Sequence, residues 1–285
     1  MAHEPLVSIV LPTFNGSRYL NESVQSCIAQ TFLNWELIIV DDASTDKTQS
    51  LIAGFVKTDP RIRSLRNDVN RKLPASLNRG FKESHGEYIT WTSDDNYYAA
   101  EALEKMVSFL KENPTTDLVY ADFQTMDDSG KLIGPKRVGA VEELWEGNCI
   151  GACFLYKRLM QERLGGYSEN LFLAEDYDFW LRASAQFKFH PLHEFLYFYR
   201  YHGASLTSAQ SDKTAALSDL ALAGNLRELH WLSKDLKIEA ALRLIKGALQ
   251  RGQFADAASW ARYAVEISPS LAAGTLIKKL FRTFG

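Results

Sequence analysis

The sequence has few cysteines, and they do not form a recognisable pair. Cys27, Cys149 and Cys153 are the three cysteines among 285 residues, and no Cys-x-x-Cys motif is present. Their spacing gives no support for a zinc ribbon or a redox motif. We expect free, mostly buried thiols in a protein of a reducing compartment.

Long apolar runs and an excess of positive charge are also missing, and the first residues do not have the pattern of a leader peptide. No stretch approaches the roughly 18 apolar residues of a membrane span. The first residues, Met-Ala-His-Glu-Pro, lack a basic region followed by an apolar run, so we expect no signal peptide. The formal net charge of -3 gives no broad basic field for nucleic acid. These absences predict a cytoplasmic protein that does not bind nucleic acid.

Short apolar runs alternate with segments of helical spacing over the first 120 residues, in a chain that is 46% hydrophobic and 24% charged. Strands are predicted at residues 7–12, 36–41, 61–65, 86–92 and 117–120. Helices are predicted at residues 18–30, 74–83 and 99–111. Another helix is expected to run to about Lys57, with Ser44 or Thr45 as its cap. Short connections in this alternation imply a mostly parallel sheet with helices on both faces.

The rest of the chain divides at about Ser211. Before that point we predict a hairpin over residues 123–143, a helix at 175–185 and a strand at 195–201. After it, alanine, leucine, lysine and arginine recur with helical spacing, which predicts an all-helical segment over residues 211–285. Part of this segment fits one tetratricopeptide-like hairpin, with a plain helical cap as the alternative. The residues at the repeat offsets are Ala257, Ala261, Ala264 and Pro269.

Polar residues follow three of the predicted strands directly. They are Thr13, Asn15, Asp41, Asp42, Asp94 and Asp95. In open α/β sheets, ligands bind beyond the carboxyl ends of the strands. We therefore expect three loops to converge on one crevice.

Six segments, in this order along the chain, resemble the family 2 glycosyltransferases, which are inverting enzymes with a GT-A fold. The segments are residues 7–15, 39–46, 77–80, 86–96, 164–167 and 174–182. The resemblance covers about residues 5–208 and implies a GT-A nucleotide-sugar-binding catalytic domain over residues 1–210. It also implies transfer of a sugar from a nucleotide-sugar donor, a UDP-sugar by preference, to an acceptor hydroxyl.

A nucleoside-diphosphate sugar carries dense negative charge, which calls for a hard divalent cation with oxygen ligands. The resemblance implies that Asp95 binds this Mn²⁺ or Mg²⁺ and that Asp94 faces the ribose. Ser93 departs from the first aspartate of many members. The alternative for these acids is a turn and a helix cap. His202 is implied to lie close to the diphosphate or metal, with a structural histidine as the alternative.

The nucleotide base is implied to contact Asp42, because an acceptor-only carboxylate suits the N3–H of uracil. The alternative is a helix cap for the segment from Ser44, a role that Asp41 can have at the same time. The same subsite includes Pro12, Thr13, Phe14 and Asn15. Phe14 is able to stack on the base, or is a plain loop aromatic.

A basic residue near the base or diphosphate is implied at Arg71 or Lys72. The spacing of these two residues to Asn78, which is also placed with the donor, leaves open which of them is equivalent. The alternative is a solvated basic loop.

Inverting transfer needs one carboxylate to take the proton of the acceptor hydroxyl. By the resemblance this base is Asp176, with Glu175 as the second candidate, while Asp178 would turn away in a helix. Helix-dipole compensation explains one acid at a helix start better than three.

Two other functions compete with this interpretation. One is an inactive nucleotide-sugar-binding module that uses the helical C-terminus as an interaction surface. The other, a nucleotidyltransferase, usually has a Gly-rich loop after the first strand, where only Gly16 stands here.

Bacterial relatives suggest surface glycan synthesis, with a glycan or lipid-linked acceptor. Residues 276–284 form an apolar stripe flanked by Lys278, Lys279 and Arg282. This pattern predicts either a weak peripheral contact with the inner face of the membrane or packing against the helix at 255–267.

Overall fold

The computed structural model describes residues 6–203 and 211–273. The apolar stripe at 276–284 lies outside the described residues, so its membrane contact stays a prediction. Among the described helices, none combines the length and apolar character that crossing a membrane requires. The three cysteines are free, as expected; Cys27 and Cys153 are buried and Cys149 is half-buried.

The first half of the sheet is parallel, in the spatial order β3-β2-β1-β4. Its strands are β1 (Val7–Thr13), β2 (Trp35–Asp41), β3 (Ile62–Arg66) and β4 (Tyr88–Trp91). The helices that connect or follow them are α1 (Leu20–Ile28), α2 (Thr48–Thr58), α3 (Lys72–Lys82) and α4 (Ala102–Glu112). Each of these elements was predicted from the sequence, with boundaries that differ by a few residues.

Helices cover both faces of this sheet. Neighbouring strand residues point to opposite faces, so each strand contributes side chains to both cores. Val10 of β1 belongs to the core that includes Leu77 of α3. Ile9 and Leu11 belong to the second core, with Leu20 of α1. The strands are therefore buried on both faces, which explains why they are almost continuously apolar.

The second half of the sheet is mixed rather than parallel. It contains β5 (Tyr97–Tyr98), β6 (Leu118–Met126), β7 (Leu132–Lys136), β8 (Cys153–Lys157) and β9 (Phe189–Arg200). The unpredicted strand β8 lies antiparallel between β4 and β6, whereas β9 is parallel to β6. No helical crossover separates β6 from β8, and antiparallel pairing needs none. The prediction of a mostly parallel sheet thus describes the N-terminal half only.

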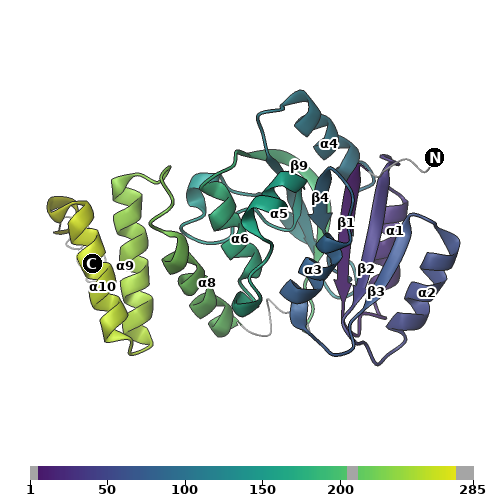
Figure 1. The fold of residues 1–285 in the computed structure, drawn as a ribbon, viewed down its shortest axis with the longest axis horizontal. Helices are drawn as coiled ribbons and strands as arrows, with labels where there is room; N and C mark the ends of the chain where they lie inside the picture. Colours follow the sequence, from purple (N-terminus) through teal and green to yellow (C-terminus); the bar gives the residue numbers. More distant parts are fainter. Residues whose placement is uncertain (1–5, 204–210, 274–285) are drawn as a thin grey trace.

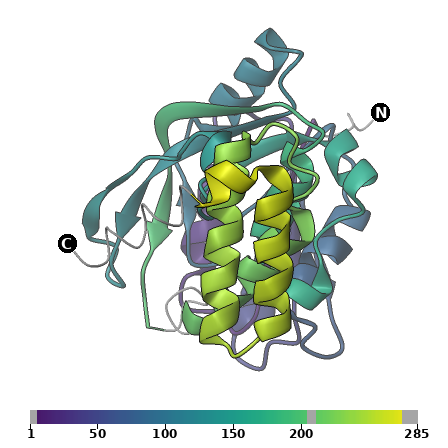
Figure 2. The same cartoon turned by 90° about the vertical axis from the view of Figure 1, so that its left-hand side faces the viewer.

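The C-terminal helices extend the molecule at one end (Figure 1). Helix α6 (Glu175–Ser184) follows α5 (Arg158–Leu164), and α8 (Ser211–Asn225) packs against α6. Helices α9 (Lys234–Gln250) and α10 (Phe254–Ile267) form a hairpin, which faces the viewer in Figure 2. Leu222 and Leu244 share one apolar core with Trp180 of α6. The all-helical prediction is thereby confirmed for the described residues, while the domain boundary at 210 and the tetratricopeptide-like repeat stay predictions.

Candidate active site

Asp95 and His202 are brought together by the loop after β4 and the end of β9. The imidazole Nε2 of His202 lies 2.8 Å from Oδ2 of Asp95. The other oxygen, Oδ1, is buried without a hydrogen-bond partner among the described residues. A buried carboxylate oxygen without a partner is rare and costly. This donor set fits a divalent cation that takes its remaining ligands from phosphate oxygens.

Within residues 6–203 and 211–273, no cluster of three or more histidine, cysteine, aspartate or glutamate side chains could hold a metal alone. A cation at Asp95 would thus depend on the donor for part of its coordination.

Asp94 is held at the end of β1 by Thr13, whose hydroxyl donates to Oδ2 of Asp94. A Cβ atom at Gly16 would lie 2.0 Å from the same oxygen, so any larger residue would displace the Asp94 carboxylate from this position. Burial, followed by the charge of Asp95, raises the pKa of Asp94 to about 7. The sequence did not single out Gly16 for this packing role. In the sequence, a single glycine after a strand looks the same whether a turn requires it or close packing requires it.

Arg200 of β9 is a second residue that sequence reasoning missed, and it joins the elements around Asp95. It is 3% exposed, and its Nε donates to the carbonyl of Asp95 at 3.0 Å. Its Nη1 approaches the carbonyls of Asp127 and Asp128 at the β6–β7 turn, and its Nη2 pairs with Glu22 of α1.

Asp41 at the end of β2 and Asp42 after it accept hydrogen bonds from neighbouring backbone N–H groups, and neither Ser44 nor Thr45 caps α2. Asp41 accepts from the N–H of Ser44 at 2.9 Å and pairs with Arg66. Helix α2 begins later, and the N–H of Thr48 donates to Asp46 at 2.9 Å. The cap prediction was therefore wrong, because a loop separates β2 from the helix.

Asp42 is buried and accepts hydrogen bonds from the loop that leads into α3. Its Oδ1 accepts from the side chain of Asn67 at 2.7 Å and from the N–H of Arg71 at 2.8 Å. Its Oδ2 accepts from the N–H of Lys72 at 2.9 Å. A carboxylate has about four lone-pair positions, so one on Oδ2 remains for a ligand.

The segment after β1 presents one exposed aromatic side chain. Phe14 is 49% exposed, whereas Pro12 is buried in β1 beside β2. Asn15 accepts from the N–H of Thr45 at 2.8 Å and donates its own N–H to Ser44 at 2.9 Å. Asn15 thus joins the two loops, and Phe14 is free to stack.

Arg71 and Lys72 are both exposed at the start of α3. Arg71 lies 3.7 Å from the carboxylate of Glu169. Asn78, further along α3, exchanges two hydrogen bonds of 2.8 Å with the backbone of Tyr167. These bonds use both ends of the Asn78 amide to fix the Gly166–Tyr167 turn, and its contact with a donor stays a prediction.

The acids at the start of α6 occupy three different environments. Asp178 pairs with Arg182 at 2.8 Å and accepts from Asn225 of α8, so its carboxylate is engaged elsewhere than those of Glu175 and Asp176, as expected. Glu175 is buried, and burial together with the charge of Asp176 raises its pKa to about 8. Burial also raises the pKa of Asp176, opposed by the N–H of Tyr177.

Several residues in the segments that carry these side chains have strained backbone φ angles. Among the described residues, four that are not glycine have a positive φ: Asn15, Ala43, Lys72 and Leu173. They lie after β1, after β2, at the start of α3 and before α6. Strained residues persist where the surrounding structure fixes them, commonly at ligand sites.

Comparison with known proteins gives a consistent result. The sequence profile of Glycosyl transferase family 2 matches residues 8–165. An uncharacterized glycosyltransferase of Rickettsia prowazekii is 27% identical over 229 residues, which cover 76% of this chain and 71% of that protein. The Escherichia coli protein UDP-Glc:alpha-D-GlcNAc-diphosphoundecaprenol beta-1,3-glucosyltransferase WfgD is 29% identical over 179 residues, or 62% of this chain and 68% of that protein.

Solved structures share the fold at lower identity. Residues 1–349 of TarS from S. aureus, in complex with UDP-GlcNAc, match with a TM-score of 0.68 and 15% identity, over 95% of this chain and 92% of that chain. The mannosyltransferase PcManGT from Pyrobaculum calidifontis, in complex with GDP-Man and Mn²⁺, matches with a TM-score of 0.66 and 20% identity, over 99% and 84%. With the profile match across more than half of its length, the chain belongs to glycosyl transferase family 2 and has the GT-A fold.

Proposed function

We propose that this glycosyltransferase moves a sugar from a nucleotide-sugar donor, a UDP-sugar, to an acceptor hydroxyl with inversion at the anomeric carbon. The observation that carries the proposal is a pair of carboxylate sites, one in the loop after β4 and one in the first turn of α6. One site is Asp95 with His202, and the other is Asp176. The first has an unpaired buried oxygen. The second accepts from a helix N–H and from a side-chain amide.

At the donor end, Asp95 and His202 would hold a divalent cation, Mn²⁺ or Mg²⁺. When bound, such a cation neutralises charge on the diphosphate and stabilises it as a leaving group. Asp94, which Thr13 holds at the end of β1, would face the ribose.

Nucleotide recognition is assigned to Asp42 and Phe14. The free acceptor position on Oδ2 of Asp42 suits the N3–H of uracil, and the exposed ring of Phe14 suits stacking on the base. Arg71 or Lys72 would lie near the diphosphate. TarS was solved with UDP-GlcNAc and PcManGT with GDP-Man, which supports a nucleotide-sugar donor without deciding the base.

At the acceptor end, Asp176 would take the hydroxyl proton as the bond to the anomeric carbon forms and the bond to the diphosphate breaks. A single displacement needs this one base and no covalent nucleophile. Glu175 is the weaker candidate, because a carboxyl with a pKa of about 8 is mostly protonated at neutral pH.

The acceptor class we propose is a glycan or a lipid-linked sugar of a bacterial surface polymer. WfgD, whose name describes a glucosyltransferase acting on a diphosphoundecaprenol-linked sugar, supports this class. Work at the inner face of the membrane would follow from such an acceptor.

The experiment is a screen of UDP-glucose, UDP-GlcNAc and GDP-mannose for release of the nucleoside diphosphate, with Mn²⁺, Mg²⁺ or EDTA. We expect metal-dependent release from a UDP-sugar. Donor binding without release, for all three donors and with lipid-linked acceptors present, would instead identify an inactive binding module.

A further inference from the structure

The loop between β7 and β8 carries Asn148 to the carboxylate of Asp176. The Nδ2 of Asn148 donates to Oδ2 of Asp176 at 2.8 Å. Its Oδ1 accepts from the N–H of Ile150 at 3.1 Å. Because an N–H group engages the amide oxygen, the NH₂ end of Asn148 is the one that faces Asp176.

The same loop is fixed from behind by α6 and by the C-terminal helices. The hydroxyl of Tyr177 donates to the carbonyl of Leu144, whose side chain is fully buried. From α9, Nη1 of Arg243 donates to the carbonyl of Trp145 at 2.7 Å. Asp219 of α8 accepts from Nε of Arg243 at 3.1 Å, which fixes the guanidinium. The helices outside the sheet thus hold the loop that presents Asn148.

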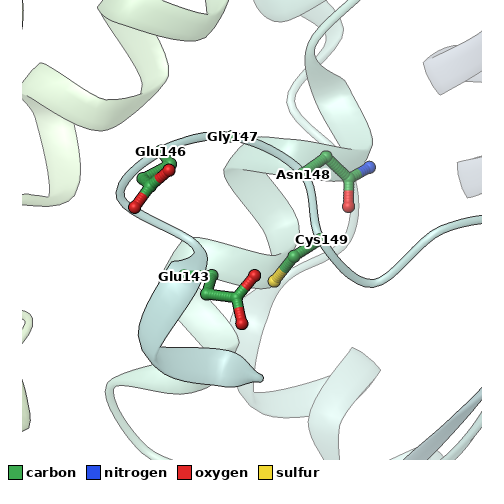
Figure 3. A pocket seen from close by; sticks show the side chains of 5 residues that line it. All are labelled: Glu143, Glu146, Gly147, Asn148 and Cys149. Carbon is green, nitrogen blue, oxygen red and sulfur yellow. The ribbon is translucent and has the colours of Figure 1, made fainter. Parts of the chain in front are cut away.

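Figure 3 shows that the side chains of this loop point in different directions. The carboxylate of Glu143 lies near Cys149, while Glu146 stands at the outer bend and Asn148 points away from it. These residues line a shallow pocket of about 210 Å³. Among the residues that line this pocket, Asn148 is the one whose side chain donates to Asp176 of α6.

We propose that Asn148 is a positioning residue for Asp176. It fixes the orientation of the carboxylate and favours its charged form, because a hydrogen bond donated to a carboxylate stabilises the ionised state. One acceptor position on Oδ2 remains for an acceptor hydroxyl, since each carboxylate oxygen offers about two. The inference rests on the proposed function, in which Asp176 is the base.

Several groups besides Asn148 act on Asp176 or respond to its charge. On α6 these are the N–H of Tyr177, which donates to Oδ1 at 2.6 Å, and the carboxyl of Glu175. From the turn after α5, the hydroxyl of Tyr167 also responds to both acids: burial raises its pKa most, and the charges of Asp176 and Glu175 raise it further. On the loop side, the carboxylates of Glu143 and Glu146 lie around Cys149. A change at Asn148 therefore has to be judged against Glu175, whose own pKa is raised by burial and by the charge of Asp176.

The first test measures Asp176 directly, whatever the reaction is. Protein labelled with ¹³C at the aspartate carboxyl carbons is titrated by NMR, and Asp176→Asn identifies the signal by removing it. In Asn148→Ala we expect the apparent pKa of Asp176 to rise by about one unit, the size expected for losing a hydrogen bond to a charged group. Asn148→Asp should raise it further, because two adjacent carboxyl groups resist ionising together.

Glu146→Gln is the matched control on the same loop, and it should leave the Asp176 titration as in the parent. Thermal unfolding checks that each variant is folded, and Glu175→Gln repeats the titration without the coupled neighbour. An unchanged Asp176 titration in both Asn148→Ala and Asn148→Asp would overturn the inference.

The second test follows nucleotide release from UDP-glucose, UDP-GlcNAc or GDP-mannose, whichever the parent cleaves. Asn148→Ala should lower kcat more at pH 6 than at pH 8, by at most about tenfold for a one-unit rise of the pKa, with the donor KM unchanged. A fall that is equal at both pH values would contradict the role. If Asp176→Asn released nucleotide at the parent rate, the assignment of Asp176 as the base would fail. The NMR titration would still test whether Asn148 controls the ionisation of Asp176.

Discussion

The guanidinium of Arg200 donates to the backbone carbonyl of Asp95, with 3.0 Å between Nε and the oxygen. The same side chain pairs with Glu22 of α1 and reaches the turn that joins β6 and β7. Arg200 therefore connects three elements that are far apart in the sequence and meet behind the proposed cation ligands. Its conformation fixes the backbone from which the Asp95 carboxylate projects.

Arg200→Met should destabilise the protein by about 1–3 kcal/mol, the usual cost of leaving a buried polar group without its partner. Urea unfolding of the parent and the variant measures this difference. Glu22→Gln is the milder comparison, because Glu22 is half-exposed and its removal leaves the carbonyl contacts in place. Equal stability of Arg200→Met and the parent would contradict the connecting role.

Asp95→Asn and His202→Ala should each abolish the effect of Mn²⁺ on UDP binding. In the parent, UDP should bind more tightly with Mn²⁺ than with EDTA, because the cation joins the carboxylate to the diphosphate. Isothermal titration with and without Mn²⁺ checks this. Asp256→Asn, at an exposed position on α10, serves as a control that keeps the dependence. A parent that binds UDP equally well under both conditions would refute the cation site.

Asp176→Asn should lower turnover by about 10² to 10⁴, the usual contribution of a general base, while the donor affinity changes little. The product formed by the parent should have the inverted anomeric configuration. Proton NMR of the product gives the configuration, and retention would disprove the single displacement.

Asp42→Ala should weaken UDP binding by about 1–3 kcal/mol through the loss of a buried acceptor. Its structural role adds a second effect, because the N–H groups of Arg71 and Lys72 lose their common partner. Asp42→Asn keeps one acceptor oxygen and should fall between the parent and Asp42→Ala. Discrimination between UDP and GDP, measured by titration, should shrink in both variants; unchanged discrimination would remove Asp42 from base recognition.

The sequence predicted those parts of the molecule whose signals are local. Strands β1 and β2 are apolar runs that end in polar residues, and α1 and α3 show helical spacing. Strand β8 was missed because its five residues follow a long loop and carry no turn signal. Its direction also depends on pairing with β4 and β6, which no local pattern encodes.

The same distinction applies to the site. Asp95 and Asp176 were named because motifs surround them, and their roles stay predictions. Arg200 and Asn148 stand outside any motif, and their partners Glu22 and Asp176 are 178 and 28 residues away. Contacts of this kind are created by the tertiary fold, so a single sequence does not reveal them.

The buried carboxyl of Glu175 should make stability depend on pH. Its pKa is raised from 4.5 to about 8, chiefly by burial and then by the charge of Asp176. Between these two values the folded protein keeps a proton that the unfolded chain releases. The free energy of unfolding should therefore fall as the pH rises from about 4.5 to about 8.

Glu175→Gln should flatten this dependence, because glutamine keeps an oxygen for the N–H of Leu173 but does not titrate. Urea unfolding of the parent and the variant at several pH values between 5 and 8.5 measures the two slopes. Glu162→Gln, at an exposed position of α5, should keep the parent slope. Parallel slopes for Glu175→Gln and the parent would show that Glu175 ionises normally, and Glu175 would then again be a candidate for the base. A flattened slope, together with sugar transfer that is retained in Glu175→Gln, would support Asp176 as the base.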